Sequence, residues 1–95
     1  MAANFRIQIH RKNADLNLEL TGDFDGSSAF ELINILRENN GKTRKLVIDT
    51  RGISSIHPFG LRVFQKHCSI NSLSKDLTFT GRNGSTMALQ ELHSL

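Results

Sequence analysis

The stretch Lys45 to His67, KLVIDTRGISSIHPFGLRVFQKH, decides the fold of this chain. It opens with the apolar run Leu46-Val47-Ile48, which is typical of a strand covered on both faces, as in a parallel sheet. Thr50-Arg51-Gly52 then predicts a turn, and Pro58 has the fixed φ that suits the first position of a helix. Strand, loop and helix follow one another directly, so we expect Ser54 to Gly60 to form an exposed knuckle on a rigid base.

The helix that follows the knuckle is marked by its apolar spacing. Apolar residues recur at three- and four-residue intervals, whereas polar residues fall mostly on the opposite side. The apolar set is Leu61, Val63, Phe64, Cys68 and Ile70, and the polar set is Arg62, Gln65, Lys66 and Ser69. Two more apolar anchors, Ile53 and Ile56, lie in the connection before the helix.

Length and composition indicate a single soluble domain. The chain has 95 residues, of which 38% are hydrophobic and 22% are charged. No apolar run approaches the roughly 20 residues that cross a bilayer, and the N-terminus lacks the apolar segment of a signal peptide. Its one cysteine, Cys68, lies on the apolar side of the predicted helix, which favours a core residue over a reactive thiol. We therefore expect a cytoplasmic protein with no direct membrane insertion.

The net charge of +3 does not indicate a nucleic-acid-binding protein. Its twelve Lys and Arg residues are scattered from Arg6 to Arg82, with the densest group at Lys42, Arg44 and Lys45. The chain has no Trp or Tyr and no run of aromatic residues interleaved with basic ones. The mild positive charge instead favours an acidic partner surface.

The N-terminal part of the chain predicts two half-buried strands. Apolar residues alternate with polar ones, first at Phe5, Ile7 and Ile9 and then at Leu16, Leu18 and Leu20. Turn-forming residues lie between the two runs, at 12–15. This pattern predicts an antiparallel hairpin.

A polar loop and a first long helix come next. Ser28 and Glu31 have the spacing of a capping box, and Asp25 lies where a carboxylate would meet unpaired N–H groups at the helix start. Gly41 is the expected stop. The predicted apolar face of this helix consists of Ala29, Phe30, Leu32, Ile33 and Leu36.

The remaining elements complete an α/β fold. We expect a turn at Asn71 to Lys75, a short strand with Leu77 and Phe79 facing inward, and a last helix from about Ser85. That helix carries Met87, Ala88, Leu89 and Leu92. The order is β-β-α-β-α-β-α, with a small mixed sheet and covering helices. The N-terminal strand is expected antiparallel at or near one edge, and the two sheet faces are expected to be covered unequally.

A search for catalytic residues yields little. The four histidines show neither the pairing nor the cysteine partners of a metal site, and the pair Asp23 and Asp25 fits capping better than acid–base chemistry. Asp49 suits either a bound metal or hydroxyl, or a brace for the loop after its strand. Residues 81–84 lack the Gly-Lys-Ser/Thr ending of a phosphate-binding loop. We therefore expect no enzyme, no metal site and no cofactor.

Several segments together resemble the STAS domain of bacterial anti-sigma factor antagonists. These are Leu20-Thr21-Gly22-Asp23-Phe24-Asp25, Leu46-Val47-Ile48-Asp49, Ile53-Ser54-Ser55-Ile56-His57-Pro58-Phe59-Gly60-Leu61 and Leu77-Thr78-Phe79-Thr80-Gly81. Each motif is weakly specific, whereas their joint order and spacing are more specific. The resemblance implies one STAS-like domain over residues 1–95, lacking the family's last strand and helix.

The resemblance departs from the family at one position that concerns regulation. In these antagonists a Ser after the loop Asp accepts phosphate from an ATP-dependent anti-sigma kinase. When the chain is aligned on Gly60-Leu61, the loop Asp becomes His57, the acceptor becomes Pro58, and the next hydroxyl residue becomes Phe59. Ser54 and Ser55 lie upstream in a different register. The resemblance therefore implies a domain without the family's phosphoacceptor.

Our functional hypothesis is a non-enzymatic protein-interaction domain whose partner is an anti-sigma factor or switch kinase. Two alternatives remain: a STAS subunit that braces the ATPase of a membrane transporter complex, and a small nucleotide- or lipid-handling enzyme with a deep polar pocket. Phe59 either contacts the partner or turns into the core. The expected partner-binding residues are Asp23, Asp25, Ser55, His57, Pro58, Phe59, Gly60, Arg62 and Lys66.

Overall fold

The chain forms a four-stranded mixed sheet. In this computed structural model, which describes residues 4–39, 42–70, 77–81 and 84–87, the strand order is β1-β2-β3-β4. β1 pairs antiparallel with β2, whereas β2 with β3 and β3 with β4 are parallel. The strands are β1 (Arg6–Lys12), β2 (Asp15–Phe24), β3 (Lys45–Ile56) and β4 (Leu77–Thr80). The predicted hairpin and the interior position of the Leu46-Val47-Ile48 strand are confirmed.

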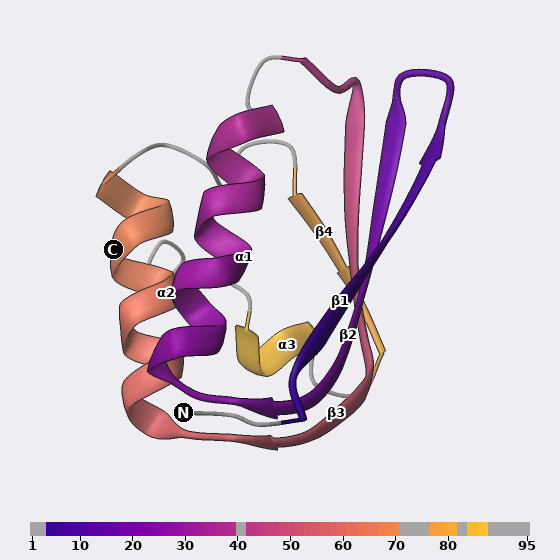
Figure 1. The fold of residues 1–95 in the computed structure, drawn as a ribbon. Coiled ribbons are helices and arrows are strands. Elements are labelled where there is room, and N and C mark those ends of the chain that lie inside the picture. The colour runs from indigo at the N-terminus through magenta and orange to yellow at the C-terminus, as the bar shows by residue number, and fades with distance from the viewer. Residues whose placement is uncertain (1–3, 40–41, 71–76, 82–83, 88–95) are drawn as a thin grey trace.

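Three helices accompany this sheet in the described ranges of the chain. Figure 1 shows α1 (Gly26–Asn39) and α2 (Pro58–Ile70) side by side on one face, with the short α3 (Gly84–Met87) on the same side. The predicted element order and the helix start at Pro58 are confirmed. The predicted turn at residues 71–75, the stop at Gly41 and the last helix from Ala88 onward lie outside the described residues.

The core lies between the helices and the sheet. Alternation in β2 points Leu16, Leu18, Leu20 and Phe24 toward the helices, where all four are buried. A chain of edge-to-face ring contacts crosses this core: Phe5 to Phe24, Phe24 to Phe64, and Phe64 to Phe79, with centroids 5.9, 6.0 and 6.0 Å apart. The other core residues are Ala29, Leu32, Ile33, Leu36, Leu46, Ile48, Ile53, Cys68 and Met87. The prediction of Cys68 as a core residue is confirmed.

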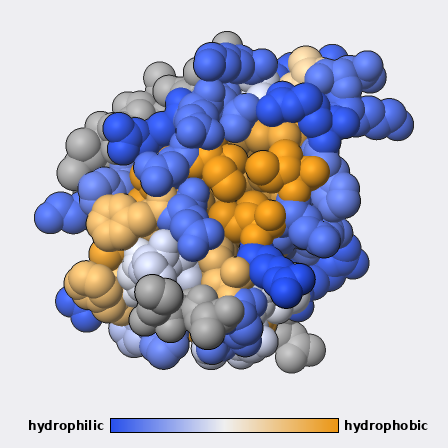
Figure 2. All heavy atoms as spheres, viewed as in Figure 1, coloured by the Kyte–Doolittle hydropathy of each residue, from blue (hydrophilic) through white to orange (hydrophobic). Residues whose placement is uncertain are grey.

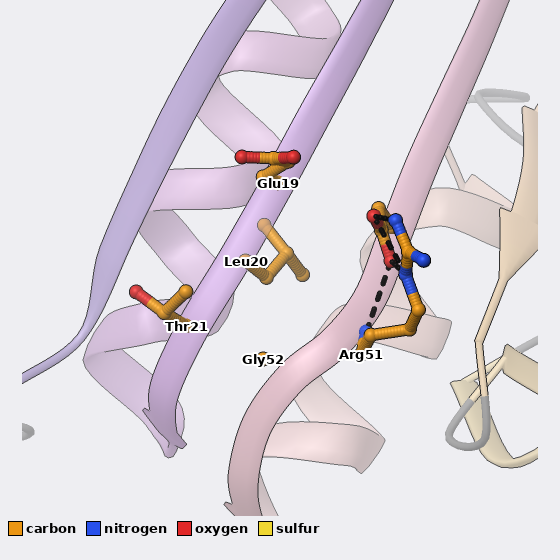
Figure 3. Close-up of a pocket in the computed structure, with 6 residues that line it drawn as sticks. Glu19, Leu20, Thr21, Arg51 and Gly52 are labelled. Atoms are coloured by element: carbon orange, nitrogen blue, oxygen red, sulfur yellow. Dashed lines mark hydrogen bonds and ion pairs between the residues drawn. The ribbon is translucent and has the colours of Figure 1, made fainter.

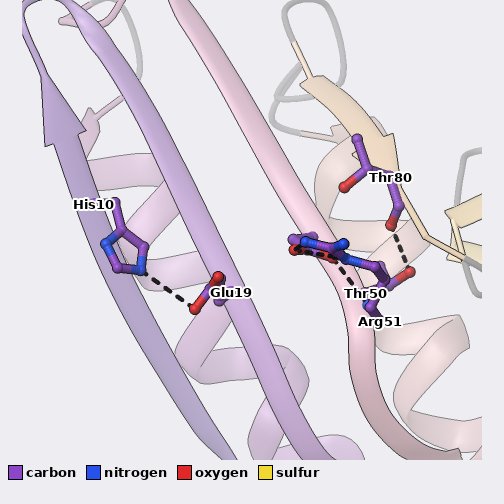
Figure 4. A network of polar contacts seen from close by, with 6 residues as sticks. His10, Glu19, Thr50, Arg51 and Thr80 are labelled. Carbon is purple, nitrogen blue, oxygen red and sulfur yellow. Dashed lines mark hydrogen bonds and ion pairs between the residues drawn. The ribbon is translucent and has the colours of Figure 1, made fainter.

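The opposite face of the sheet carries polar side chains, and no helix of the described residues lies on it. Figure 4 shows the pair His10 and Glu19 there, with Nε2 and Oε1 3.3 Å apart across β1 and β2. The same view shows Arg51 folded back along β3. Among the described residues the helices therefore cover one face only (Figure 1). The expectation that both faces are covered, and with it the strand at Leu46-Val47-Ile48 covered on both faces, is wrong for this part of the chain.

The turn predicted at Thr50-Arg51-Gly52 is wrong, because β3 continues through it as a bulged strand. Glu19 pairs with Asp49 but Thr21 pairs with Gly52, so β3 holds one extra residue, and a second shift follows between Gly22 and Asp23. Figure 3 shows this part of β3 beside β2. Bulges let the strand keep pairing while it bends.

Asp49 holds the first bulge. Its carboxylate accepts hydrogen bonds from the backbone N–H of Arg51 at 3.0 Å and from the Arg51 Nη2 at 2.8 Å (Figure 3). The bonds from the Arg51 side chain lower the pKa of Asp49, and its burial opposes them. Of the two interpretations of Asp49, the brace fits this geometry.

Two details of the first helix also differ from the sequence prediction. Ser28 does not cap α1, because it lies buried inside the first turn and Asp25 accepts its N–H instead. Phe30 is not on the buried face, because 48% of it is exposed. Its ring contacts that of His67 on α2, with centroids 5.4 Å apart, so it lies at the seam between the two helices.

The central position of Phe64 predicts a large loss of stability on truncation. Phe64 is fully buried and contacts two other rings, so Phe64→Ala should lower the free energy of unfolding by ~3–5 kcal/mol. Phe59→Ala, at a side chain 67% exposed, is the matched control and should cost no more than ~1 kcal/mol. Urea unfolding of both variants measures the difference. Equal losses would contradict this placement of the core.

Candidate protein-interaction site

Both long helices begin at the same end of the sheet, where the strands β2 and β3 finish. Phe24 and Ile56 are the last paired residues of the parallel strands β2 and β3, so these strands end side by side. The N–H of His57 donates to the carbonyl oxygen of Phe24 at 2.9 Å and extends this pairing by one bond. Loops at the carboxyl ends of parallel strands are the usual position of functional residues in α/β folds.

Asp25 caps α1 with three hydrogen bonds. One oxygen, Oδ1, accepts from the N–H of Ser28 at 3.0 Å, from the Ser27 hydroxyl at 2.8 Å and from the Ser28 hydroxyl at 3.1 Å. The bond from the Ser28 N–H is the largest cause that holds the pKa of Asp25 well below its ordinary value, followed by the bond from Ser27. The capping role predicted for Asp25 is confirmed, and its charge is engaged inside the loop.

Gly60 allows the start of α2 to approach this loop closely. A Cβ at Gly60 would lie 2.6 Å from the backbone carbon and oxygen of Asp25, a distance that backbone atoms cannot accommodate without moving. Gly26 plays the matching part for the ring of Phe59, since a Cβ there would lie 2.9 Å from Cε2 of that ring. These two glycines let the starts of both helices lie close together.

Phe59 projects outward at this junction. It is 67% exposed, more than any other large hydrophobic residue among those the structure describes, so the alternative that it turns into the core is wrong. His57 and Pro58 beside it are exposed as well. An exposed aromatic ring on a rigid base is a common anchor in protein interfaces.

A side-chain bond ties the two strand ends together. The Ser55 hydroxyl donates to Oδ1 of Asp23 at 2.8 Å, and the N–H of Asp23 donates to the Asn4 side-chain oxygen at 3.3 Å. Asp23 and Ser55 lie next to each other as a pair in the β2 and β3 register. The structure therefore brings together most of the predicted residues in one place.

Arg62 and Lys66 continue this surface along α2. Both are exposed, and they follow Phe59 at intervals of three and four residues, so the three side chains share one solvent-facing stripe. Lys66 follows Phe59 by seven positions, which is about 10 Å along a helix. We call the predicted set the knuckle surface: Asp23, Asp25, Ser55, His57, Pro58, Phe59, Gly60, Arg62 and Lys66.

Sequence reasoning missed the contributions of Gly26 and Phe30 to this region. Gly26 receives the Phe59 ring, and Phe30 lies exposed where α1 meets α2. Phe30 fits the apolar spacing of α1. That spacing alone does not show that Phe30 stays partly exposed beside α2. Gly26 next to the capping Asp25 was the available signal, because a residue without a side chain leaves room for a neighbour.

The described residues offer little for catalysis. No group of three or more His, Cys, Asp or Glu residues among them is arranged to hold a metal ion. A hollow of about 200 Å³ on the polar sheet face is lined by Glu19, Leu20, Thr21, Asp49, Arg51 and Gly52 (Figure 3). Its buried carboxylate, Asp49, is held ionised by Arg51, which does not suit a proton donor at neutral pH.

In the described part of the chain, none of the helices has the length and apolar character that crossing a membrane requires.

The structure is similar to solved structures of anti-sigma factor antagonists. One from Mycobacterium paratuberculosis matches with a TM-score of 0.61 and 15% identity, over 99% of this chain and 81% of that one. A STAS domain of an antagonist from Rhodobacter sphaeroides matches with a TM-score of 0.63 and 13% identity, over 90% and 97%. The fold is STAS-like.

Another match is to a structure of Mglu, with a TM-score of 0.66 and 17% identity over 79% of this chain. That match covers only 19% of the Mglu chain, so the present sequence spans about a fifth of its length. No protein-family model matches the sequence, and no curated protein does either. At these identities the comparisons show the STAS-like fold and leave function to the residues of the site.

The Asp25 cap of this STAS-like domain predicts a pH-dependent loss of stability. Its pKa is lower in the folded chain than the ordinary value of 3.8, so its stabilisation is present above that value and is lost as the pH falls through the folded pKa. Asp25→Ala should lower the melting temperature at neutral pH, and its gap to wild type should narrow as the pH falls below 3.8.

Asp25→Asn is the matched control. It keeps an acceptor for the Ser28 N–H but removes the charge, so it should retain more of the stability than Ala while losing the acid dependence. Thermal unfolding followed by circular dichroism between about pH 7 and pH 3 measures all three proteins. A gap between Ala and wild type that stays constant over this range would contradict a capping charge.

Proposed function

We propose that this chain is a non-enzymatic protein-interaction domain that acts in the cytoplasm and binds an anti-sigma factor or switch kinase through the knuckle surface. The observation that carries the proposal is Phe59, which is 67% exposed at the point where both helices begin. Gly60 and Gly26 hold its surroundings in place through close backbone and ring contacts. A fixed aromatic anchor loses little conformational freedom on binding.

The charges around Phe59 indicate the chemistry of the partner. Arg62 and Lys66 are exposed on the same stripe of α2 as Phe59, and that stripe carries no carboxylate. Asp25 nearby is already bound by its own loop, so its charge is partly satisfied. The complementary partner surface has an apolar recess for the ring and acidic residues beside it.

The proposal includes binding that phosphorylation at the knuckle does not reverse. Pro58, at the position of the family's acceptor, has no hydroxyl, and its neighbours His57 and Phe59 have none. The hydroxyl residue that comes closest before Pro58 in the sequence is Ser55, at the end of β3. Its hydroxyl already donates a hydrogen bond to the carboxylate of Asp23 at 2.8 Å. A phosphate on Ser55 would place about two further negative charges against that carboxylate, which disfavours the modified form.

Removal of the anchor ring should weaken partner binding strongly. Affinity purification from the native host followed by mass spectrometry identifies the partner, and titration of the purified partner then gives the Kd of each variant. Phe59→Ala should raise the Kd by about thirtyfold or more, as expected of a central aromatic anchor. Phe30→Ala, an exposed ring at the helix seam, is the matched control and should change the Kd less.

The identity of the recovered protein distinguishes the proposed function from the transporter-subunit alternative. An anti-sigma kinase supports the proposal, whereas an ATPase of a membrane transporter would support the accessory-subunit alternative. An unchanged Kd for Phe59→Ala would place the binding surface elsewhere.

Incubation with the recovered kinase and ATP should leave binding unchanged. Phosphosite mapping by mass spectrometry, with the Kd measured before and after incubation, tests this directly. Ser54→Ala and Ser55→Ala are the control variants. For both of them, as for wild type, the Kd should be the same before and after incubation with the kinase and ATP. Stoichiometric phosphate on Ser54 or Ser55 with loss of binding would show that the switch has moved to a neighbouring residue.

A further inference from the structure

The outer edge of β1 has no paired strand among the residues that the structure describes. β1 is the terminal strand of the sheet, and within the described ranges no strand pairs with its free side. An open edge presents backbone N–H and C=O groups that can pair with another extended chain. Six of its seven residues are exposed, the exception being Ile7.

The hairpin register identifies the outward backbone groups. Lys12 pairs with Asp15 across the two-residue loop Asn13-Ala14, and the first loop residue has φ of 57°. In such a hairpin the residues that flank the loop exchange hydrogen bonds, and the pattern then alternates along the strands. The N–H and C=O groups of Ile7, Ile9 and Arg11 therefore point away from β2.

The charge of this edge is uniformly positive. The segment Arg6 to Lys12 contains three Arg and Lys residues and no carboxylate. The nearest carboxylates, on β2, are already engaged: Glu19 with His10 at 3.3 Å, and Asp15 with Arg44 at 3.2 Å. An incoming strand that carries acidic side chains meets positive charges at both ends of the edge, Arg6 at one end and Arg11 and Lys12 at the other.

The same charges oppose pairing between two copies of this chain. An antiparallel pair of β1 strands centred on Ile9 would place Arg6 opposite Lys12 twice. No other register brings an opposite charge into the pair, because the segment contains none. Like charges directly across a strand pair are destabilising, so the edge disfavours self-association and favours an acidic strand.

An apolar contact is available beside the edge. Ile9 is 52% exposed on the helix side of β1, and Ile7 and Ile35 are half-buried against the core there. Figure 2 shows apolar side chains gathered between α1 and the β1–β2 hairpin. Alternate side chains of an added strand would point to this side, where apolar residues gain contact, while the others point to the polar sheet face.

We propose that the β1 edge binds an extended, acidic segment of a partner protein by strand addition. The outward groups of Ile7, Ile9 and Arg11 supply the backbone pairing, Ile9 supplies the apolar contact, and Arg6, Arg11 and Lys12 select acidic side chains. This surface shares no residue with the knuckle surface, so it stands independently of the function proposed there.

A synthetic peptide of alternating glutamate and valine, with blocked ends, is the probe. Titration into the ¹⁵N-labelled chain should shift the amide signals of Ile7, Ile9 and Arg11 and protect them from hydrogen exchange. The same peptide with every backbone amide N-methylated keeps its charge but can donate no backbone hydrogen bond along either edge, and it should bind at least tenfold more weakly.

Charge variants supply the second arm of the test. The double variant Arg6→Glu with Lys12→Glu should weaken binding of the glutamate–valine peptide at least tenfold. Arg37→Glu with Lys42→Glu changes the net charge equally at exposed positions outside the β1 edge and the knuckle surface, and this variant should bind the peptide as wild type does.

Three results would overturn the proposal. They are the absence of binding up to ~1 mM peptide, equal binding of the N-methylated peptide, and dimerisation of the chain through β1 in light scattering. The third would make a second copy the occupant of the edge.

Discussion

The parallel pairing of β2 with β3 is the constraint on which the rest of the structure depends. It joins segments about thirty residues apart in the sequence, from Asp15 with Lys45 to Phe24 with Ile56. The apolar side chains of both strands form the floor on which α1 and α2 pack, and the last bond, from the His57 N–H to the Phe24 carbonyl, sets where α2 begins. The fold and the knuckle surface thus have the same origin.

The two bulges in β3 add residues to this pairing just before the knuckle surface. β3 uses twelve residues where β2 uses ten, and each extra residue reverses which side of the sheet the next side chain faces. After the first bulge Ile53, rather than Gly52, lies buried. Asp49 and Arg51 hold the bulge on the polar face, while the Thr50 hydroxyl donates to the Thr80 carbonyl at 2.7 Å and fastens β4 (Figure 4).

These bulges explain where sequence reasoning succeeded and where it did not. The strictly alternating residues of β1 and β2 and the helical spacing at Phe64 and Cys68 were sufficient to predict element type, order and core. The apolar residues of β3 lose their period of two at the first bulge, so the second half of the strand looked like a turn. Period alone also could not place Phe30, because only the packing of α2 decides which flank of α1 stays exposed.

The candidate site, too, could be predicted from the sequence only in part. The position of the knuckle followed from a strand and a helix in close succession, but the loop expected between them is wrong, because β3 runs to Ile56 and only His57 separates it from α2. The capping role of Asp25 followed from its place before the helix. The pairing of Ser55 with Asp23 depends on the register of two strands, and the register depends on the bulges. The contacts of Gly60 and Gly26 depend on the distance between two helix starts, which no local pattern encodes.

The knuckle surface has a consequence for how the chain is monitored inside a cell. Its parts come from opposite sides of the α1 crossover, so the surface exists only after β2, α1, β3 and α2 have all docked. A partner that recognises it selects folded molecules and leaves unfolded or half-made chains unbound. Such a partner at a hundredfold excess over its Kd adds about 2.7 kcal/mol to the free energy of unfolding. For a small domain that is a large share of its total stability, so under the proposed function the lifetime of the protein would depend on the abundance of its partner.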